Sequence, residues 1–217
     1  MIQNFPPIGL IIIGLNVIFT FIGFKNVAFF EKYRFHIGSI KAGEYYRLLS
    51  SGFLHVNTNH ILFNMFTFYF FVNIVVGMLG TTIFLLLFVG SLLAGNFFCY
   101  YFHYNDNYYS AVGASGAVTG ILFSALLLYP DIELMLFLIP IPIPGYIFGI
   151  GYLLYTLYGM KTQNDRIGHT AHFGGALGGI LTTLLVKPDV IYSSIFMLSI
   201  LTFAIFIGGI LLYRNQN

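Results

Sequence analysis

The chain has 217 residues, of which 58% are apolar and 7% are charged, whereas a soluble domain carries about a quarter charged residues. This composition indicates a protein embedded in a lipid bilayer. The net charge of +2 without a basic run excludes the usual surface of a nucleic-acid-binding protein, and the single Cys99 excludes an internal disulfide and a cysteine-based zinc site.

Seven apolar runs are candidates for membrane-spanning helices, because about 17 to 25 residues cross a hydrocarbon core of about 30 Å. In chain order they are 8–24, 60–79, 82–102, 113–129, 145–158, 170–186 and 191–213. The second and third runs are joined by almost no loop, which predicts an antiparallel helical hairpin. Before the short fifth run, Pro140, Pro142 and Pro144 lack amide donors and predict an extended segment. We expect no soluble domain and no internal repeat.

The N-terminal part of the chain divides into a span and an interfacial segment. The run 8–24 has no Lys or Arg before it and no small-residue cleavage site after it, so we interpret it as a retained span rather than a signal peptide. Between residues 25 and 59 lie five of the nine Lys and Arg residues, mixed with Phe and Tyr. That mixture is typical of the membrane interface.

Polar side chains that could carry chemistry lie at the starts of three spans. Ser115 lies among small residues at the start of the fourth span, and His172 lies near the start of the sixth. His60 and Asn64 are four residues apart and therefore share one helix face at the start of the second span. An unpaired polar group in lipid costs several kcal/mol, so these groups need partners or a water-filled cavity.

Two pairs of glycines predict that the fourth and sixth spans pack closely. The pairs are Gly116 with Gly120 and Gly175 with Gly179. This small-xxx-small spacing lets helices in lipid approach each other. If the two spans pack through these glycines, Ser115 and His172 start at similar depth and come within hydrogen-bond reach.

A serine beside a histidine in such a pocket is typical of nucleophilic catalysis. The imidazole of His172 would take the proton of Ser115 and later give it to the leaving amine. His60 and Asn64, with the backbone amide of Ser115, would donate to the oxygen that becomes negative in the tetrahedral intermediate. A single such donor can contribute on the order of 3 kcal/mol.

Taken together, these motifs resemble those of the rhomboid intramembrane serine proteases. The residues that carry the likeness are Gly43-Glu-Tyr-Tyr-Arg47, the spacing His55-x4-His60-x3-Asn64, Gly113-Ala-Ser-Gly116, and Ala171-His172 followed by Gly175 and Gly179. The resemblance implies an all-α membrane protein with a six-helix core and a water-filled cavity open to the outer face. It also implies a dyad of Ser115 and His172 without an acid. The oxyanion and substrate-binding positions would be His60, Asn64 and Gly113.

The resemblance further implies the kind of substrate and the division of the chain. Substrates would be transmembrane helices, cut near one end where small and helix-breaking residues let the strand unwind into the site. The run 145–158 would be a mobile gate beside that site. The six-span core would occupy residues 1–187, and residues 188–217 would add one C-terminal transmembrane helix and a tail. We expect a multi-pass protein of a bacterial inner membrane that uses no cofactor and no metal.

Several features depart from the family pattern. Tyr46 stands where rhomboids usually have a tryptophan before Arg47, and Val76 stands where an acidic residue is common near the cytoplasmic end of the second span. Thr119 stands where an aromatic ring often stacks on the catalytic imidazole. The distribution of charge is a further conflict. With a cytoplasmic N-terminus, as in the family, most Lys and Arg residues would lie in loops outside the cell rather than in cytoplasmic loops, against the positive-inside rule.

Two other functions remain open from the residues. The histidines at positions 55, 60, 169 and 172 could bind a metal in an ion transporter or a membrane metalloenzyme. Against this, the segment His169-Thr-Ala-His172 lacks the glutamate of zinc-protease helices, and no carboxylate lies within a span. Alternatively, the chain is an inactive relative that binds membrane helices without cutting them. The presence of both Ser115 and His172 argues against that interpretation.

Overall fold

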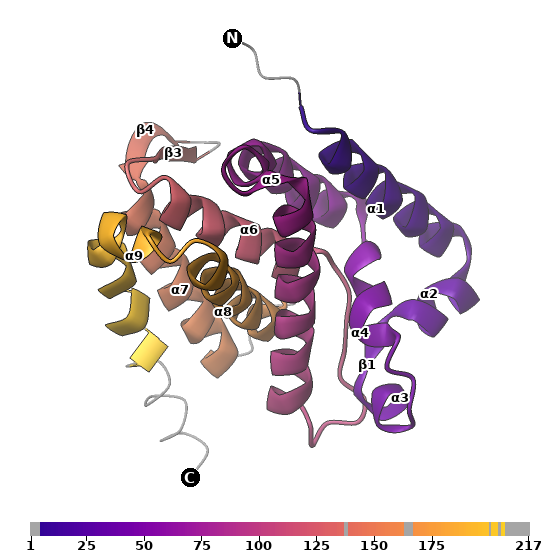
Figure 1. Ribbon diagram of the computed structural model, residues 1–217. Helices are drawn as coiled ribbons and strands as arrows, with labels where there is room; N and C mark the ends of the chain where they lie inside the picture. The colour runs from indigo at the N-terminus through magenta and orange to yellow at the C-terminus, as the bar shows by residue number, and fades with distance from the viewer. Residues whose placement is uncertain (1–4, 137–138, 163–166, 200, 204, 207–217) are drawn as a thin grey trace.

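The described part of the chain folds into a bundle of helices with two short antiparallel strand pairs (Figure 1). The computed structural model describes residues 5–136, 139–162, 167–199, 201–203 and 205–206. The helices are α1 Pro7–Lys25, α2 Val27–Tyr33, α3 Ile37–Lys41, α4 Arg47–Ser50, α5 Thr58–Phe102, α6 Ser115–Leu128, α7 Gly145–Thr162, α8 His169–Val186 and α9 Val190–Ser193, with a 3-10 turn η1 at Ser51–Phe53. The strands are β1 Phe35–His36, β2 Ser110–Ala111, β3 Glu133–Leu136 and β4 Ile139–Pro144. The fold is therefore mostly helical, and the two strand pairs are an addition to the predicted all-α class.

Three of the predicted spans correspond closely to helices. α1, α6 and α8 begin and end within two residues of the runs 8–24, 113–129 and 170–186. Local signals explain the agreement. Pro7 occupies the first turn of α1, where a missing amide donor is tolerated. α8 ends at Val186, just before Pro188, because the residue that precedes a proline is disfavoured in a helix.

The second and third predicted runs form one element, α5, which bends at Gly80. Gly80 has a φ of 77° and a ψ of 165°, a conformation that glycine adopts without steric cost. Phe68 in the first half of α5 packs against Phe84 and Phe88 in the second half, with ring centroids 6.0 and 6.1 Å apart. Among the described residues, α1 and α5 are the helices long and apolar enough to cross a membrane. With 45 residues, α5 is long enough for two crossings.

α6 lies at the centre of the bundle, packed against both α5 and α8 (Figure 1). Every residue of α6 from Gly116 to Leu128 is buried. A Cβ atom on Gly175 of α8 would fall on the carbonyl oxygen of Gly116, and one on Gly179 would fall on the carbonyl oxygen of Gly120. The two helices therefore touch backbone to backbone, an approach that only residues without a side chain allow.

α8 also packs against α5 through glycines, which the sequence pattern did not single out. A Cβ atom on Gly174 would lie 2.8 Å from the carbonyl oxygen of Ala94, and one on Gly178 would lie 2.8 Å from the Cβ of the same alanine. On the α5 side, a Cβ atom on Gly95 would lie 2.6 Å from the carbonyl oxygen of Ala171. α8 therefore packs against α5 and α6 through glycines on two of its faces. These contacts fix the position of its first turn relative to both helices.

The segment between α1 and α5, here called the first loop (residues 26–57), folds around Arg47. The guanidinium of Arg47 donates to the carbonyl oxygens of Glu31 and Arg34 at 2.7 and 2.9 Å, and to the carboxylate of Glu44 at 2.6 Å. The hydrogen bond from Arg47 lowers the pKa of the Glu44 carboxyl group. Arg47 itself is only 6% exposed. The predicted interfacial segment is therefore a hydrogen-bonded unit organised by one buried cation.

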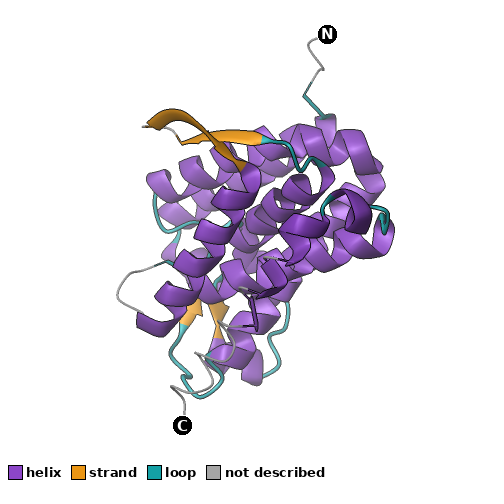
Figure 2. Cartoon of the chain, turned by 90° about the vertical axis from the view of Figure 1, so that its left-hand side faces the viewer, coloured by secondary structure: helices purple, strands orange, loops and turns teal. Residues whose placement is uncertain are grey.

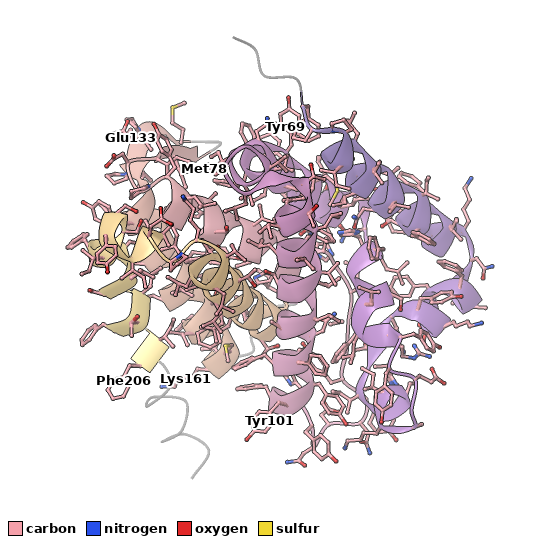
Figure 3. The ribbon with its side chains drawn as sticks, in the orientation of Figure 1. Tyr69, Met78, Tyr101, Glu133, Lys161 and Phe206 are labelled. Atoms are coloured by element: carbon pink, nitrogen blue, oxygen red, sulfur yellow. The ribbon has the colours of Figure 1, made fainter. Side chains whose placement is uncertain are left out.

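β3 and β4 form a hairpin between α6 and α7. β3 pairs antiparallel with β4, with Glu133 opposite Pro144 and Met135 opposite Pro142, so the predicted extended segment before the fifth run is confirmed. Figure 2 shows this hairpin at one end of the bundle and the β1–β2 pair at the other. In Figure 3, Glu133 lies at the same end as Met78, and Tyr101 and Lys161 lie at the opposite end. α5 and α7 therefore finish at the end where α8 begins.

α7 is longer than the sequence predicted. It begins at Gly145, as expected, but continues to Thr162, so the expected end at Tyr158 was wrong. Gly159 and Met160 are buried, because this turn packs into the bundle beside α8. Tertiary packing therefore extends the helix through residues that resemble a loop in the sequence.

The C-terminal region is helical after a bend. α9 ends at Ser193. The hydroxyl of the next residue, Ser194, donates to the carbonyl oxygen of Leu127 at 2.7 Å, and helical residues resume at 195–199. The predicted seventh span, 191–213, lies partly outside the described residues. The hydrogen bond from Ser194 joins its start to α6, and the ring of Phe196 contacts that of Tyr146 in α7.

Candidate functional site

Ser115 is the first residue of α6, and Gly113 shapes the backbone before it. Gly113 has a φ of 131°, a conformation that residues with a side chain rarely adopt. Its amide donates to the carbonyl oxygen of Ser51 in η1 at 3.0 Å. The β1–β2 pair ties the preceding residues to the same first loop. The first loop thus fixes the backbone just before Ser115, the first residue of α6.

His172 lies in the first turn of α8, opposite the start of α6. A Cβ atom on Gly116 would lie 3.3 Å from the carbonyl oxygen of Ala171. Gly116 follows Ser115 and Ala171 precedes His172, so the residues that adjoin the predicted dyad are in contact. Ser115 and His172 are each partly exposed, whereas their sequence neighbours are buried. Both side chains therefore border accessible space within an otherwise buried interface.

The imidazole of His172 is held by a residue that the sequence motifs did not indicate. Tyr152 Oη of α7 lies 3.1 Å from His172 Nδ1, and the two rings stack with centroids 6.1 Å apart and 25° between their planes. The same hydroxyl lies 3.1 Å from Thr119 Oγ1 of α6. The sequence carried little signal for this contact, because α7 contains several tyrosines and their spacing does not distinguish Tyr152.

His60 of α5 lies beside Gly113 and Ser115. The position that a Cβ atom on Gly113 would occupy is 2.9 Å from His60 Nε2 and 3.7 Å from Ser115 Oγ. The place of the missing Gly113 side chain therefore adjoins both Ser115, the predicted nucleophile, and His60, the predicted oxyanion donor. Because residue 113 is a glycine, no side chain fills that place. Asn64 is placed differently, because its amide donates to the carbonyl oxygen of His60 in its own helix at 3.0 Å. That bond uses one of its two N–H donors.

His55 connects His60 to α1. Its Nδ1 lies 2.9 Å from Thr20 Oγ1, and the rings of His55 and His60 meet edge to face with centroids 4.9 Å apart. Burial lowers the pKa of His55 to about 3, so its imidazole is neutral at neutral pH. His55 Nε2 and His60 Nδ1 are both buried, and neither has a hydrogen-bond partner among the described residues. His55 therefore packs against the ring of His60 as a neutral imidazole.

The arrangement of the other histidines bears on the metal alternative. His103 stacks on Tyr109 with ring centroids 3.6 Å apart, and its Nε2 lies 3.3 Å from Thr170 Oγ1. Burial lowers the pKa of His103 to about 4. His169 meets His172 edge to face, with centroids 6.2 Å apart. In the part of the chain that the structure describes, no group of three or more His, Cys, Asp or Glu side chains lies close enough together to hold a metal ion.

Comparison with known proteins relates this arrangement to one family. Residues 42–189, more than half of the chain, match the Rhomboid domain. The chain is 34% identical over 143 residues to "Putative rhomboid protease YdcA" of Bacillus subtilis, which covers 66% of this chain and 68% of that protein. It is 26% identical over 185 residues to "RHOMBOID-like protein 12, mitochondrial" of Arabidopsis thaliana, covering 78% of this chain and 54% of the relative.

A third relative, "Rhomboid protein 1, mitochondrial" of Saccharomyces cerevisiae, is 26% identical over 137 residues, which is 62% of this chain and 40% of the yeast protein. The chain therefore spans about half or less of the length of these two mitochondrial relatives. The matched region, 42–189, contains each of the predicted site residues, from His60 to Gly179.

Proposed function

We propose, from the premise that this chain belongs to the rhomboid family, that it is an intramembrane serine endopeptidase that cleaves transmembrane helices. The observation that carries the proposal is the backbone contact between α6 and α8. A Cβ atom on Gly116 would lie 3.3 Å from the carbonyl oxygen of Ala171, so the residues next to Ser115 and His172 are in contact, which supports the pairing of these two side chains. The membrane character of α1 and α5 supports an integral membrane location, and we propose a bacterial inner membrane.

In the proposed reaction, Ser115 Oγ attacks the carbonyl carbon of the scissile peptide bond while its proton passes to His172 Nε2. The tetrahedral intermediate then expels the amine, which takes that proton from the imidazolium, and an acyl ester remains on Ser115. A water molecule, deprotonated by the same imidazole, hydrolyses the ester and restores the serine. In this proposal, His60 Nε2 and the Ser115 amide donate to the negative oxygen, with Asn64 as a further donor. The absence of a side chain at Gly113, next to His60 Nε2 and Ser115 Oγ, supports this role.

The proposal is tested by covalent labelling in parallel with cleavage. The purified chain is reconstituted in liposomes with a generic transmembrane substrate, and aliquots receive a fluorophosphonate probe or EDTA. We expect mass spectrometry to find the phosphonyl group on Ser115, cleavage to stop in proportion to labelling, and EDTA to change neither. Cleavage that EDTA abolishes and that survives labelling would instead indicate a metalloenzyme. Substrate binding without cleavage or labelling would indicate an inactive relative.

Replacing His60 with alanine is expected to reduce kcat by roughly 10²- to 10³-fold with a much smaller change in KM, because one preorganised oxyanion donor contributes about that factor. Asn64→Ala should cause a smaller loss, since one of its donors is already bonded within α5. Steady-state cleavage in liposomes measures both constants. Equal losses in substrate binding and turnover, accompanied by a lower unfolding temperature, would show that these residues serve the fold.

A further inference from the structure

We propose that Tyr152 of α7 is a positioning residue for His172, and that its hydroxyl selects the imidazole tautomer that can accept the proton of Ser115. The inference rests on the proposed function and concerns the same site. It starts from two contacts of one hydroxyl: Tyr152 Oη lies 3.1 Å from His172 Nδ1 and 3.1 Å from Thr119 Oγ1. α7 is thereby connected to both helices that carry the predicted dyad.

The direction of these hydrogen bonds decides whether the site has a base. A neutral imidazole carries its proton on one nitrogen, and the partner of either nitrogen influences which one it is. His172 can receive a proton on Nε2 only in the tautomer that is protonated on Nδ1. In that tautomer Nδ1–H donates to Tyr152 Oη, and the phenolic O–H donates to Thr119 Oγ1. The reverse direction would place the proton on Nε2 and leave Ser115 without a base.

The same hydrogen bond gains strength during the reaction. After Ser115 gives up its proton, the Nδ1–H donor of His172 belongs to a cation, and hydrogen bonds from charged donors are roughly twice as strong as neutral ones. Tyr152 therefore stabilises the charged state more than the neutral one. An interaction that is stronger in the transition state than in the ground state raises kcat rather than substrate affinity.

The aromatic neighbours of Tyr152 hold its ring in place. Phe148 of the same helix stacks on it with centroids 6.1 Å apart, and Phe123 of α6 contacts it with centroids 6.0 Å apart. Thr119 is 3% exposed and supplies only a hydroxyl. The ring that stacks on His172 therefore comes from α7, not from position 119 of α6.

The kinetic test compares Tyr152→Phe, which keeps the ring and removes the hydroxyl, with Tyr158→Phe on the same helix. For Tyr152→Phe we expect kcat to fall by about ten- to a hundredfold, the loss that corresponds to one hydrogen bond to a charged group, with KM nearly unchanged. Tyr158 is 64% exposed, so Tyr158→Phe should alter neither constant. Thr119 accepts the hydrogen bond from Tyr152 in the proposed arrangement. Thr119→Val, which removes the hydroxyl, should therefore lower kcat, whereas Thr119→Ser, which keeps it, should retain the wild-type kcat.

A tautomer measurement separates positioning from a purely structural role. In full-length protein with ¹⁵N-labelled histidine, the signal of His172 is assigned by its loss in His172→Gln. The wild type should show Nδ1 protonated and Nε2 unprotonated, and Tyr152→Phe should shift the signal toward a mixture of both tautomers.

The proposal would be overturned by a wild-type proton on His172 Nε2, by an unchanged tautomer in Tyr152→Phe, or by a Tyr152→Phe variant whose only change is a lower unfolding temperature. Its failure is distinguishable from failure of the proposed function. If the wild type cleaves nothing, the protease assignment is wrong, and the ¹⁵N signal still decides whether Tyr152 sets the tautomer. If the wild type cleaves and Tyr152→Phe cleaves equally well, only the role of Tyr152 is wrong.

Discussion

Replacing Ser115 with alanine is expected to reduce kcat/KM for a transmembrane substrate by roughly 10⁴-fold or more, and His172→Ala by a similar factor. Each change removes a group that bonds to, or exchanges a proton with, the reacting atoms. Because the two residues act as a unit, the double variant should be little worse than either single variant. Single-turnover cleavage in liposomes, at a protein concentration high enough to detect residual activity, measures all three variants.

Ser193→Ala provides the matched control for these variants. Ser193 is an exposed serine of α9, outside the proposed site, so its replacement should leave kcat/KM unchanged. All variants should keep the wild-type unfolding temperature within a few degrees, since neither Ser115 nor His172 is part of the buried core. Turnover that persists in Ser115→Ala at the wild-type rate would refute the assignment of the nucleophile.

Adding a single methyl group at Gly175 should have the second-largest effect. A Cβ atom there would fall on the carbonyl oxygen of Gly116, so α8 must move away from α6 to accept alanine. A displacement of about 1 Å between catalytic groups can cost on the order of 10²-fold in rate, and overpacking costs about 1–3 kcal/mol of stability. We therefore expect Gly175→Ala to lose both activity and thermal stability, as followed by cleavage and by thermal unfolding in detergent.

Glycines elsewhere in the chain provide the controls for this prediction. At Gly77 of α5 and Gly151 of α7, nothing lies within 4 Å of the position that a Cβ atom would occupy. Alanine at either position should leave activity and stability unchanged or slightly improve stability, because alanine favours helix more than glycine does. If Gly175→Ala behaves like these controls, the close contact of α6 and α8 is not required for function.

Much of the fold could be predicted from local sequence patterns. Runs of apolar residues and the prolines that bound them located α1, α6 and α8 to within two residues. Pro142 and Pro144 predicted the extended strand before α7, because a residue without an amide donor is tolerated there and not inside a helix. The spacing of Gly175 and Gly179 correctly indicated a face of close helix contact, because the absence of a side chain is itself a local property.

Other features depended on contacts between distant residues. The last turn of α7 exists because Met160 is buried in the bundle, and the β1–β2 pair exists because the first loop and the residues before Gly113 are brought together. For the candidate site, the glycine patterns predicted the close contact of the two helices that carry Ser115 and His172. Tyr152 could not be anticipated, because no local property marks one tyrosine among several as the neighbour of a particular histidine.

The sequence by itself determined that this is a membrane protein, where α1, α6 and α8 begin and end, and which residue types could form a nucleophile, a base and an oxyanion site. Only the tertiary structure decided that Nδ1 of His172 lies beside a hydroxyl group of α7 and that Asn64 bonds within its own helix. The physical reason is the range of the interactions. The length of an apolar run, a proline or a glycine affects the segment in which it lies. The two hydrogen bonds of Tyr152, which connect α6, α7 and α8, form only after those helices have packed.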